Sequence, residues 1–191
     1  MTKPPFPLWT EEAQDAGFTD PAEIARRAGA FERTIRRRNL IEYAAGGIVF
    51  VLFFAAAVGA LWIGEWAIAS SFALILAGIA LVVRNLARRA GNLERRPEEP
   101  CLVHLRRQYA RQYAALRSVG AWYLAPLLPG LLLFYAVIAW KVSLVAGWRE
   151  ALSGIAGPFA VTFGVFAAIL AANLLAARGL KRKLDALGTL D

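Results

Sequence analysis

Cys101 and His104 carry the side chains of this chain that are best suited to chemistry. They lie three residues apart, which places both on one face of a helix. A thiol and an imidazole at this spacing could bind a metal ion together, or the imidazole could activate the thiol as a nucleophile. The chain has one cysteine and one histidine, and neither a third ligand nor an orienting acid is evident. We therefore expect no catalytic residues, no metal site and no cofactor, and we predict a non-enzymatic protein.

Four long segments without charge contain much of the apolar content of the chain. Apolar residues make up 58% of the sequence, a larger share than in ordinary soluble domains. The uncharged segments are residues 43–63, 66–83, 121–140 and 155–177. A helix of about 20 residues spans the ~30 Å hydrocarbon core of a bilayer. The sequence therefore predicts an all-α membrane protein with four transmembrane helices arranged as two hairpins.

The basic residues predict how these helices are oriented. Seven lysines and arginines precede residue 43, nine lie between residues 84 and 120, and four follow residue 177, so 20 of the 22 share one side. Because cytoplasmic loops are enriched in lysine and arginine, we expect both termini in the cytoplasm and no nucleic-acid partner for the net charge of +8. Lys141, on the other side, is expected to extend into the lipid headgroups. No cleaved signal peptide is expected, because the first apolar segment begins only near residue 43.

This pattern divides the chain into six segments. They are an irregular cytoplasmic tail (1–19), an amphipathic juxtamembrane helix (20–42), a first transmembrane hairpin (43–83), a basic cytoplasmic linker and helix (84–120), a second transmembrane hairpin (121–177) and a basic cytoplasmic C-terminus (178–191). Asp20 and Pro21 are typical of a helix start. A second amphipathic helix, within residues 84–120, is predicted from the spacing of Leu102, Leu105, Tyr109, Tyr113 and Leu116.

The tail and the first juxtamembrane helix form a candidate docking surface for a soluble cytoplasmic protein. Apolar residues recur at helical spacing in the helix, and aromatic residues in the proline-broken tail could fold onto a partner. The candidate docking residues are Phe6, Trp9, Phe18, Ile24, Phe31 and Ile35.

Basic residues near the membrane ends are candidates for contact with anionic lipid headgroups on the cytoplasmic side. They are Arg36, Arg37, Arg38, Arg106, Arg107, Arg111, Lys181, Arg182 and Lys183. Such contacts leave open a function in lipid binding or membrane shaping.

Two patterns inside the apolar segments predict how the helices pack. Small residues recur every fourth position in the last segment, and we expect this stripe to face another helix of the chain, although it also allows a homo-oligomer. The central members of the stripe are Ala160, Gly164, Ala168 and Ala172. Pro126 and Pro129 predict a kink in the third segment, which leaves open a small transporter or channel subunit. Asn173 is expected to hydrogen-bond between helices.

Three stretches resemble a family of small bacterial inner-membrane proteins that are often encoded beside extracytoplasmic-function sigma factors. The stretches are FERTIRRRNLIEY (31–43), HLRRQYARQYAALRSVGAWYLAPLLPG (104–130) and RGLKRKLDAL (178–187). The chain departs from the family at Gly120, where tryptophan usually follows the valine. The resemblance implies a location in the bacterial inner membrane and a regulator of a sigma factor, and it brings no catalytic motif.

The leading functional prediction is a regulatory or scaffolding membrane protein whose cytoplasmic helices bind a soluble partner, with a sigma factor as one candidate. Membrane lipids are the second expected partner. The alternatives are a small transporter or channel subunit and a lipid-binding, membrane-shaping protein.

Overall fold

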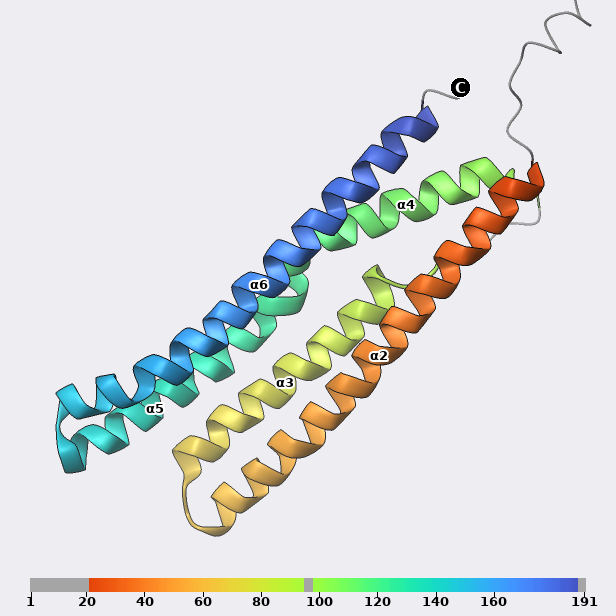
Figure 1. The fold of residues 1–191 in the computed structure, drawn as a ribbon. Helices are drawn as coiled ribbons and strands as arrows, with labels where there is room; N and C mark the ends of the chain where they lie inside the picture. The colour runs from red at the N-terminus through yellow and green to blue at the C-terminus, as the bar shows by residue number, and fades with distance from the viewer. Residues whose placement is uncertain (1–20, 95–97, 189–191) are drawn as a thin grey trace, which may run out of the picture.

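The computed structural model describes residues 21–94 and 98–188, and every regular element within them is helical (Figure 1). The α-helices are α2 (Pro21–Trp62), α3 (Trp66–Arg89), α4 (Cys101–Arg117), α5 (Leu128–Ala146) and α6 (Trp148–Gly188). Between α4 and α5 lie a π-helical segment, η1 (Gly120–Leu124), and a 3-10 turn, η2 (Ala125–Leu127). The predicted all-helical class is therefore confirmed for the described residues.

Four helical stretches are long and apolar enough to cross a membrane. They are Ala22–Trp62, Trp66–Arg89, Gly120–Ala146 and Trp148–Leu187. Large apolar side chains such as Val51, Leu52, Val161 and Leu175 are exposed along them. Soluble monomers rarely expose continuous apolar surface on this scale, whereas in a bilayer these side chains would contact acyl chains. The structure thus supports the predicted four membrane-crossing helices and suggests a multi-pass membrane protein.

Two helices run well beyond the apolar segments. α2 has 42 residues, because the predicted juxtamembrane helix and the first apolar segment form one continuous helix. After Pro21 it contains no proline, so no backbone donor is lost where the amphipathic part meets the apolar part. α6 has 41 residues and continues past residue 177 into the C-terminal basic segment.

α3 and α5 contact each other, α2 packs on α3, and α6 packs on α5 (Figure 1). α4 lies across one end of the bundle and contacts α6 and α2. This end, termed the basic end, comprises residues 21–42, 84–94, 98–120 and 178–188. The opposite end holds two tight turns, in which Gly64 and Gly147 have φ angles of 79° and 83°, a left-handed conformation that favours glycine.

An ion pair joins the two helix pairs at the end opposite the basic end. Lys141 Nζ of α5 lies 2.5 Å from Glu65 Oε2, in the turn between α2 and α3. The ammonium group of Lys141 thus pairs with a carboxylate of the neighbouring helix pair, and its extension into the lipid headgroups stays a prediction.

Two glycines bring helix backbones into contact: Gly78 of α3 lies against Pro126 of η2, and Gly130 of α5 lies against Ile75 of α3. A Cβ atom added to Gly78 would lie 2.4 Å from the Pro126 carbonyl oxygen, and one added to Gly130 would lie 2.5 Å from the Ile75 backbone nitrogen. These distances are far below van der Waals contact, so neither position has room for a side chain. The sequence patterns did not predict this contact.

The small-residue stripe of α6 does not pack as predicted. Ala160, Gly164, Ala168 and Ala172 are all exposed, and a Cβ atom added to Gly164 would meet no other atom within 4 Å. The expectation that this stripe faces another helix of the chain is therefore wrong for the described residues, because α6 turns a different face toward α5 and α4.

The backbone departs from α-helical geometry where the kink was predicted, since η1 and η2 precede α5 there. Pro126 has no N–H with which to bond the Trp122 carbonyl four residues earlier. Asn85 of α3 supplies a donor instead, and its Nδ2 lies 3.0 Å from the Trp122 oxygen. A side chain from the neighbouring helix thus compensates for the proline.

Candidate functional site

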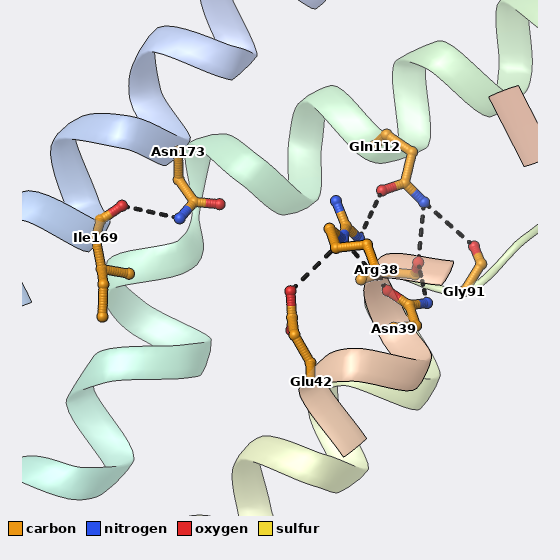
Figure 2. A network of polar contacts seen from close by, with 8 residues as sticks. Arg38, Asn39, Glu42, Gly91, Gln112, Ile169 and Asn173 are labelled. Atoms are coloured by element: carbon orange, nitrogen blue, oxygen red, sulfur yellow. Dashed lines mark hydrogen bonds and ion pairs between the residues drawn. The ribbon is translucent and has the colours of Figure 1, made fainter. Parts of the chain in front are cut away.

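Buried amide side chains fasten α2 and α4 to the end of α3 at the basic end (Figure 2). Asn39 of α2 and Gln112 of α4 are 8% and 1% exposed. Both donate to the Ala90 carbonyl oxygen, at 2.9 and 3.0 Å. Because α3 ends at Arg89, the Ala90 carbonyl has no helical partner of its own. Three elements of the fold therefore meet at one backbone atom.

Arg38 links the same two amides, as Figure 2 shows. Its Nη2 donates to Gln112 Oε1 at 3.2 Å and to Asn39 Oδ1 at 3.1 Å, and its Nε lies 3.6 Å from Glu42 Oε1. Each amide thus accepts from Arg38 with its oxygen while its nitrogen donates to Ala90. The guanidinium is held in a fixed position, half-buried between α2 and α4.

Gln108 of α4 extends the network to the linker after α3. It is 1% exposed, accepts a hydrogen bond from the Leu93 N–H at 2.8 Å, and donates to Asn92 Oδ1 at 2.7 Å. Asn92 in turn donates to the Glu32 carbonyl at 3.1 Å. Burying polar groups costs little free energy when they are hydrogen-bonded in this way, so the network can specify where α4 docks.

His104 completes the polar face of α4 and is 2% exposed. Its Nε2 lies 3.0 Å from Glu32 Oε1, and its Nδ1 lies 3.4 Å from Glu99 Oε2. Because both ring nitrogens face carboxylates, the ring is not directed at the Cys101 thiol. Within residues 21–94 and 98–188, no group of three or more histidine, cysteine, aspartate and glutamate side chains could hold a metal ion. The hydrogen bond between His104 Nε2 and Glu32 Oε1 joins α4 to α2.

Sequence patterns indicated His104 only as a candidate ligand or base and gave no role to Gln108 and Gln112. Their spacing of four residues places all three on one stripe of α4, beside the apolar face. A row of uncharged polar residues at this spacing is the signal that could have indicated a buried hydrogen-bonding face.

The predicted lipid contacts divide into two groups. The first group is partly buried and has contacts within the protein, and it consists of Arg38, Arg107 and Arg111. Arg107 Nη1 lies 2.5 Å from Glu99 Oε1, and Arg111 Nη2 donates to the Arg88 carbonyl oxygen at 2.6 Å. The exposed residues are Arg36, Arg37, Arg106, Lys181, Arg182 and Lys183. Lipid contact stays a prediction for both groups.

An open groove of about 570 Å³ lies between α2, α4 and α6 at the basic end. This basic-end groove has an apolar lining that includes Ile24, Phe31, Leu102, Leu105, Tyr109 and Leu187. The rings of Phe31 and Tyr109 pack edge to face with centroids 4.6 Å apart. Arg27 and Lys183 also line the groove and are exposed. Burial raises the pKa of the Tyr109 phenol above its ordinary value, an effect that the charge of Arg27 partly offsets, so the phenol is neutral near pH 7. Arg27 pairs with Glu23 on the same helix, which balances part of the positive charge at the groove, and Lys183 contributes a second cation.

The predicted docking residues have different environments. Ile24 and Phe31 line the basic-end groove. Ile35 is only 3% exposed, so its assignment to a free docking face is corrected: it packs inside the protein. The remaining predicted residues, Phe6, Trp9 and Phe18, lie outside the described residues.

Asn173 of α6 does not bond to another helix. Its Nδ2 donates to the Ile169 carbonyl of its own helix at 2.8 Å, which corrects the expectation of an interhelical hydrogen bond. Together with Ile169 it faces Arg38 and Glu42 across a small cavity (Figure 2).

Comparison of the chain with protein-family models, with curated proteins and with solved structures found no match. The resemblance to the sigma-factor-associated family therefore stays a prediction. A function for the basic end is therefore inferred from its own shape, charge and hydrogen bonds.

Proposed function

We propose that the protein is a non-enzymatic, regulatory or scaffolding membrane protein whose basic-end groove binds a segment of a soluble protein. The observation that supports this function is the groove itself, which combines an apolar floor with the exposed cations Arg27 and Lys183. Insertion of an amphipathic helix into an apolar groove is a recurrent mode of peptide recognition. An apolar segment with acidic flanks would match both the floor and the charge.

An extracytoplasmic-function sigma factor is the first soluble partner to test, because the family resemblance implies that genetic context. A groove at the end of a membrane bundle could hold such a protein at the membrane and so limit its access to DNA. This role requires no catalytic residue.

The proposed setting is the bacterial inner membrane, with two transmembrane hairpins and with both termini and the basic end in the cytoplasm. The placement of 20 of the 22 lysines and arginines supports this orientation.

Cys101 provides a direct test of the orientation, because it is the only cysteine in the chain and lies half-buried at the basic end. A thiol reagent that cannot cross membranes is expected to label Cys101 in inverted inner-membrane vesicles but not in intact spheroplasts. A Cys101→Ser protein that carries Glu150→Cys at the opposite end is expected to show the reverse pattern. Labelling of Cys101 from outside intact spheroplasts would contradict the proposed orientation.

A single negative charge in the groove is expected to weaken partner binding strongly. Leu102 lines the groove, whereas the neighbouring Val103 is 46% exposed and does not. In Leu102→Glu, a carboxylate would have to be buried beneath the partner or would repel its acidic flanks. We expect the affinity of the full chain in lipid nanodiscs for a purified sigma factor to fall at least tenfold, as measured by fluorescence anisotropy.

Val103→Glu is the matched control and is expected to bind like the unmodified protein, and both variants should show unchanged thermal unfolding. Empty nanodiscs of the same lipid composition report binding to lipid alone. Equal losses in the two variants, or binding no stronger than to empty nanodiscs, would refute the groove as the site for this partner.

A further inference from the structure

Three adjoining cavities form a cleft that runs from the basic end into the apolar part of the bundle. The innermost cavity, of about 210 Å³, has a mainly apolar lining that includes Ala45, Gly46, Val49, Val82, Val83 and Phe166. The middle cavity, of about 130 Å³, shares Glu42 and Ile169 with it. The outer cavity, of about 270 Å³, shares Arg38 with the middle one and is also lined by Lys183. The cleft is therefore apolar at one end and cationic at the other.

The cleft lies between α2 and α6, which do not pack against each other along their length (Figure 1). In Figure 2, Ile169 and Asn173 of α6 lie opposite Arg38 and Glu42 of α2, and no hydrogen bond or ion pair joins the two sides. Residues of all four membrane-crossing stretches line the innermost cavity. In a bilayer, the molecules that reach such an opening from the side are lipids.

The cationic end of the cleft is suited to a phosphate group. The Gln112 and Asn39 amides hold the Arg38 guanidinium in position. Because Nε and Nη2 are engaged with Asn39, Gln112 and Glu42, Arg38 would donate to a phosphate oxygen through Nη1, and such a charge-assisted hydrogen bond is stronger than a neutral one. Glu42 is the one carboxylate among the described residues that line the three cavities. Its Oε1 lies 3.6 Å from Arg38 Nε. Lys183 adds a second cation on the α6 side, so the outer end of the cleft carries a net positive charge.

We propose that the cleft binds an anionic phospholipid, with one acyl chain in the innermost cavity between α2 and α6 and the phosphate group between Arg38 and Lys183. The apolar and cationic ends of the cleft match the two ends of such a lipid, and the opening lies where the apolar and basic parts of α2 meet. Phosphatidylcholine, a zwitterionic phospholipid, would place a quaternary ammonium group near these cations and would bind more weakly. The outer end of the cleft shares Lys183 with the basic-end groove, but the acyl-chain position lies in the innermost cavity, and lipid binding there does not require partner binding in the groove.

Obstruction of the innermost cavity tests the acyl-chain position. Ala45 lines this cavity, whereas Ala44, also exposed, lines none of the cavities described. The full chain, purified in detergent, is mixed with phosphatidylglycerol, and bound lipid is counted by native mass spectrometry. Ala45→Phe is expected to reduce the bound fraction at least fivefold and Ala44→Phe to leave it unchanged. Val49→Trp, one turn away on the same helix, provides a second obstruction if Ala45→Phe lowers the thermal unfolding temperature.

The lipid headgroup and Lys183 test the cationic end. The unmodified protein is expected to retain phosphatidylglycerol at least fivefold more than phosphatidylcholine with the same acyl chains, and Lys183→Gln to remove most of that preference. Lys181→Gln, on an exposed position of the same helix, should retain it. Leu102→Glu should bind lipid normally, so a failed partner experiment leaves this result unaffected.

Two outcomes would overturn the proposal. Equal retention of the two lipids would exclude recognition of the phosphate charge. Equal lipid binding by Ala44→Phe and Ala45→Phe would show that the acyl chain does not occupy the cleft.

Discussion

Gly130→Ala is expected to destabilise the folded protein by about 3 kcal/mol, at the upper end of the usual range for overpacking. The new methyl group would lie 2.5 Å from the Ile75 nitrogen and 2.6 Å from Ile75 Cγ1. Backbone atoms of a packed helix cannot rotate away as a flexible side chain can, so α3 and α5 would have to separate. The reversible unfolding free energy in mixed micelles is the measurement. Gly78→Ala, which meets the Pro126 carbonyl, should behave in the same way.

Gly164→Ala is the matched control, because it places the same methyl group inside a helix where no other atom lies within 4 Å. Alanine favours the helix over glycine by up to about 1 kcal/mol, so this variant should be neutral or slightly more stable. If Gly130→Ala and Gly164→Ala have the same unfolding free energy, the backbone contact between α3 and α5 is absent from the protein in micelles.

These glycines also show where sequence patterns stop being informative. The α6 stripe and the pair Gly78 and Gly130 are both small residues within apolar helices, and local spacing favoured the stripe. Which small residues meet another backbone depends on how helices far apart in the sequence are rotated. In this chain the π-helical and 3-10 segments around Pro126 change the rotation of α5 about its axis. Residue spacing alone does not predict the size of that change.

The membrane-crossing elements were predictable for a simple physical reason. A stretch such as residues 43–63 carries no charge over the thickness of a bilayer, and a helix satisfies its own backbone there. The continuity of α2 was left undecided by the sequence, since either a straight helix or a bend at the membrane surface would satisfy the same pattern. The absence of proline after Pro21 is consistent with the straight helix that the structure contains.

The polar face of α4 was harder to predict than its apolar face. Leu105 and Tyr109 follow a helical period and were placed on the apolar face of an amphipathic helix, and both are buried. Gln108 and Gln112 are usually surface residues, so their burial depends on partners contributed by α2 and the linker after α3. Arg38 illustrates the same difficulty, because its charge predicted lipid contact but gave no sign that the Asn39 and Gln112 amides hold its guanidinium in place.

Gln112→Leu is expected to cost about 2–3 kcal/mol of stability, the range for breaking a buried network that includes a charged group. Leucine has a similar volume, so the loss would come from hydrogen bonding: the Ala90 carbonyl loses one donor and the Arg38 guanidinium loses an acceptor. Unfolding in mixed micelles measures the free energy. The reaction rate of Cys101 with a maleimide should also rise, because α4 would open more often. Ala110→Leu, on an exposed position of α4, should change neither quantity.

Combining Gln112→Leu with Asn39→Leu tests whether the shared carbonyl organises the basic end. Each single variant leaves Ala90 one donor, from Asn39 or from Gln112. The double variant removes both donors from a residue that is 1% exposed, and it also removes both amide oxygens that accept from Arg38. The loss in the double variant should therefore exceed the sum of the single losses by about 1 kcal/mol or more. Strictly additive losses would mean that the two amides act independently, and that α2 and α4 are not held to α3 through a common atom.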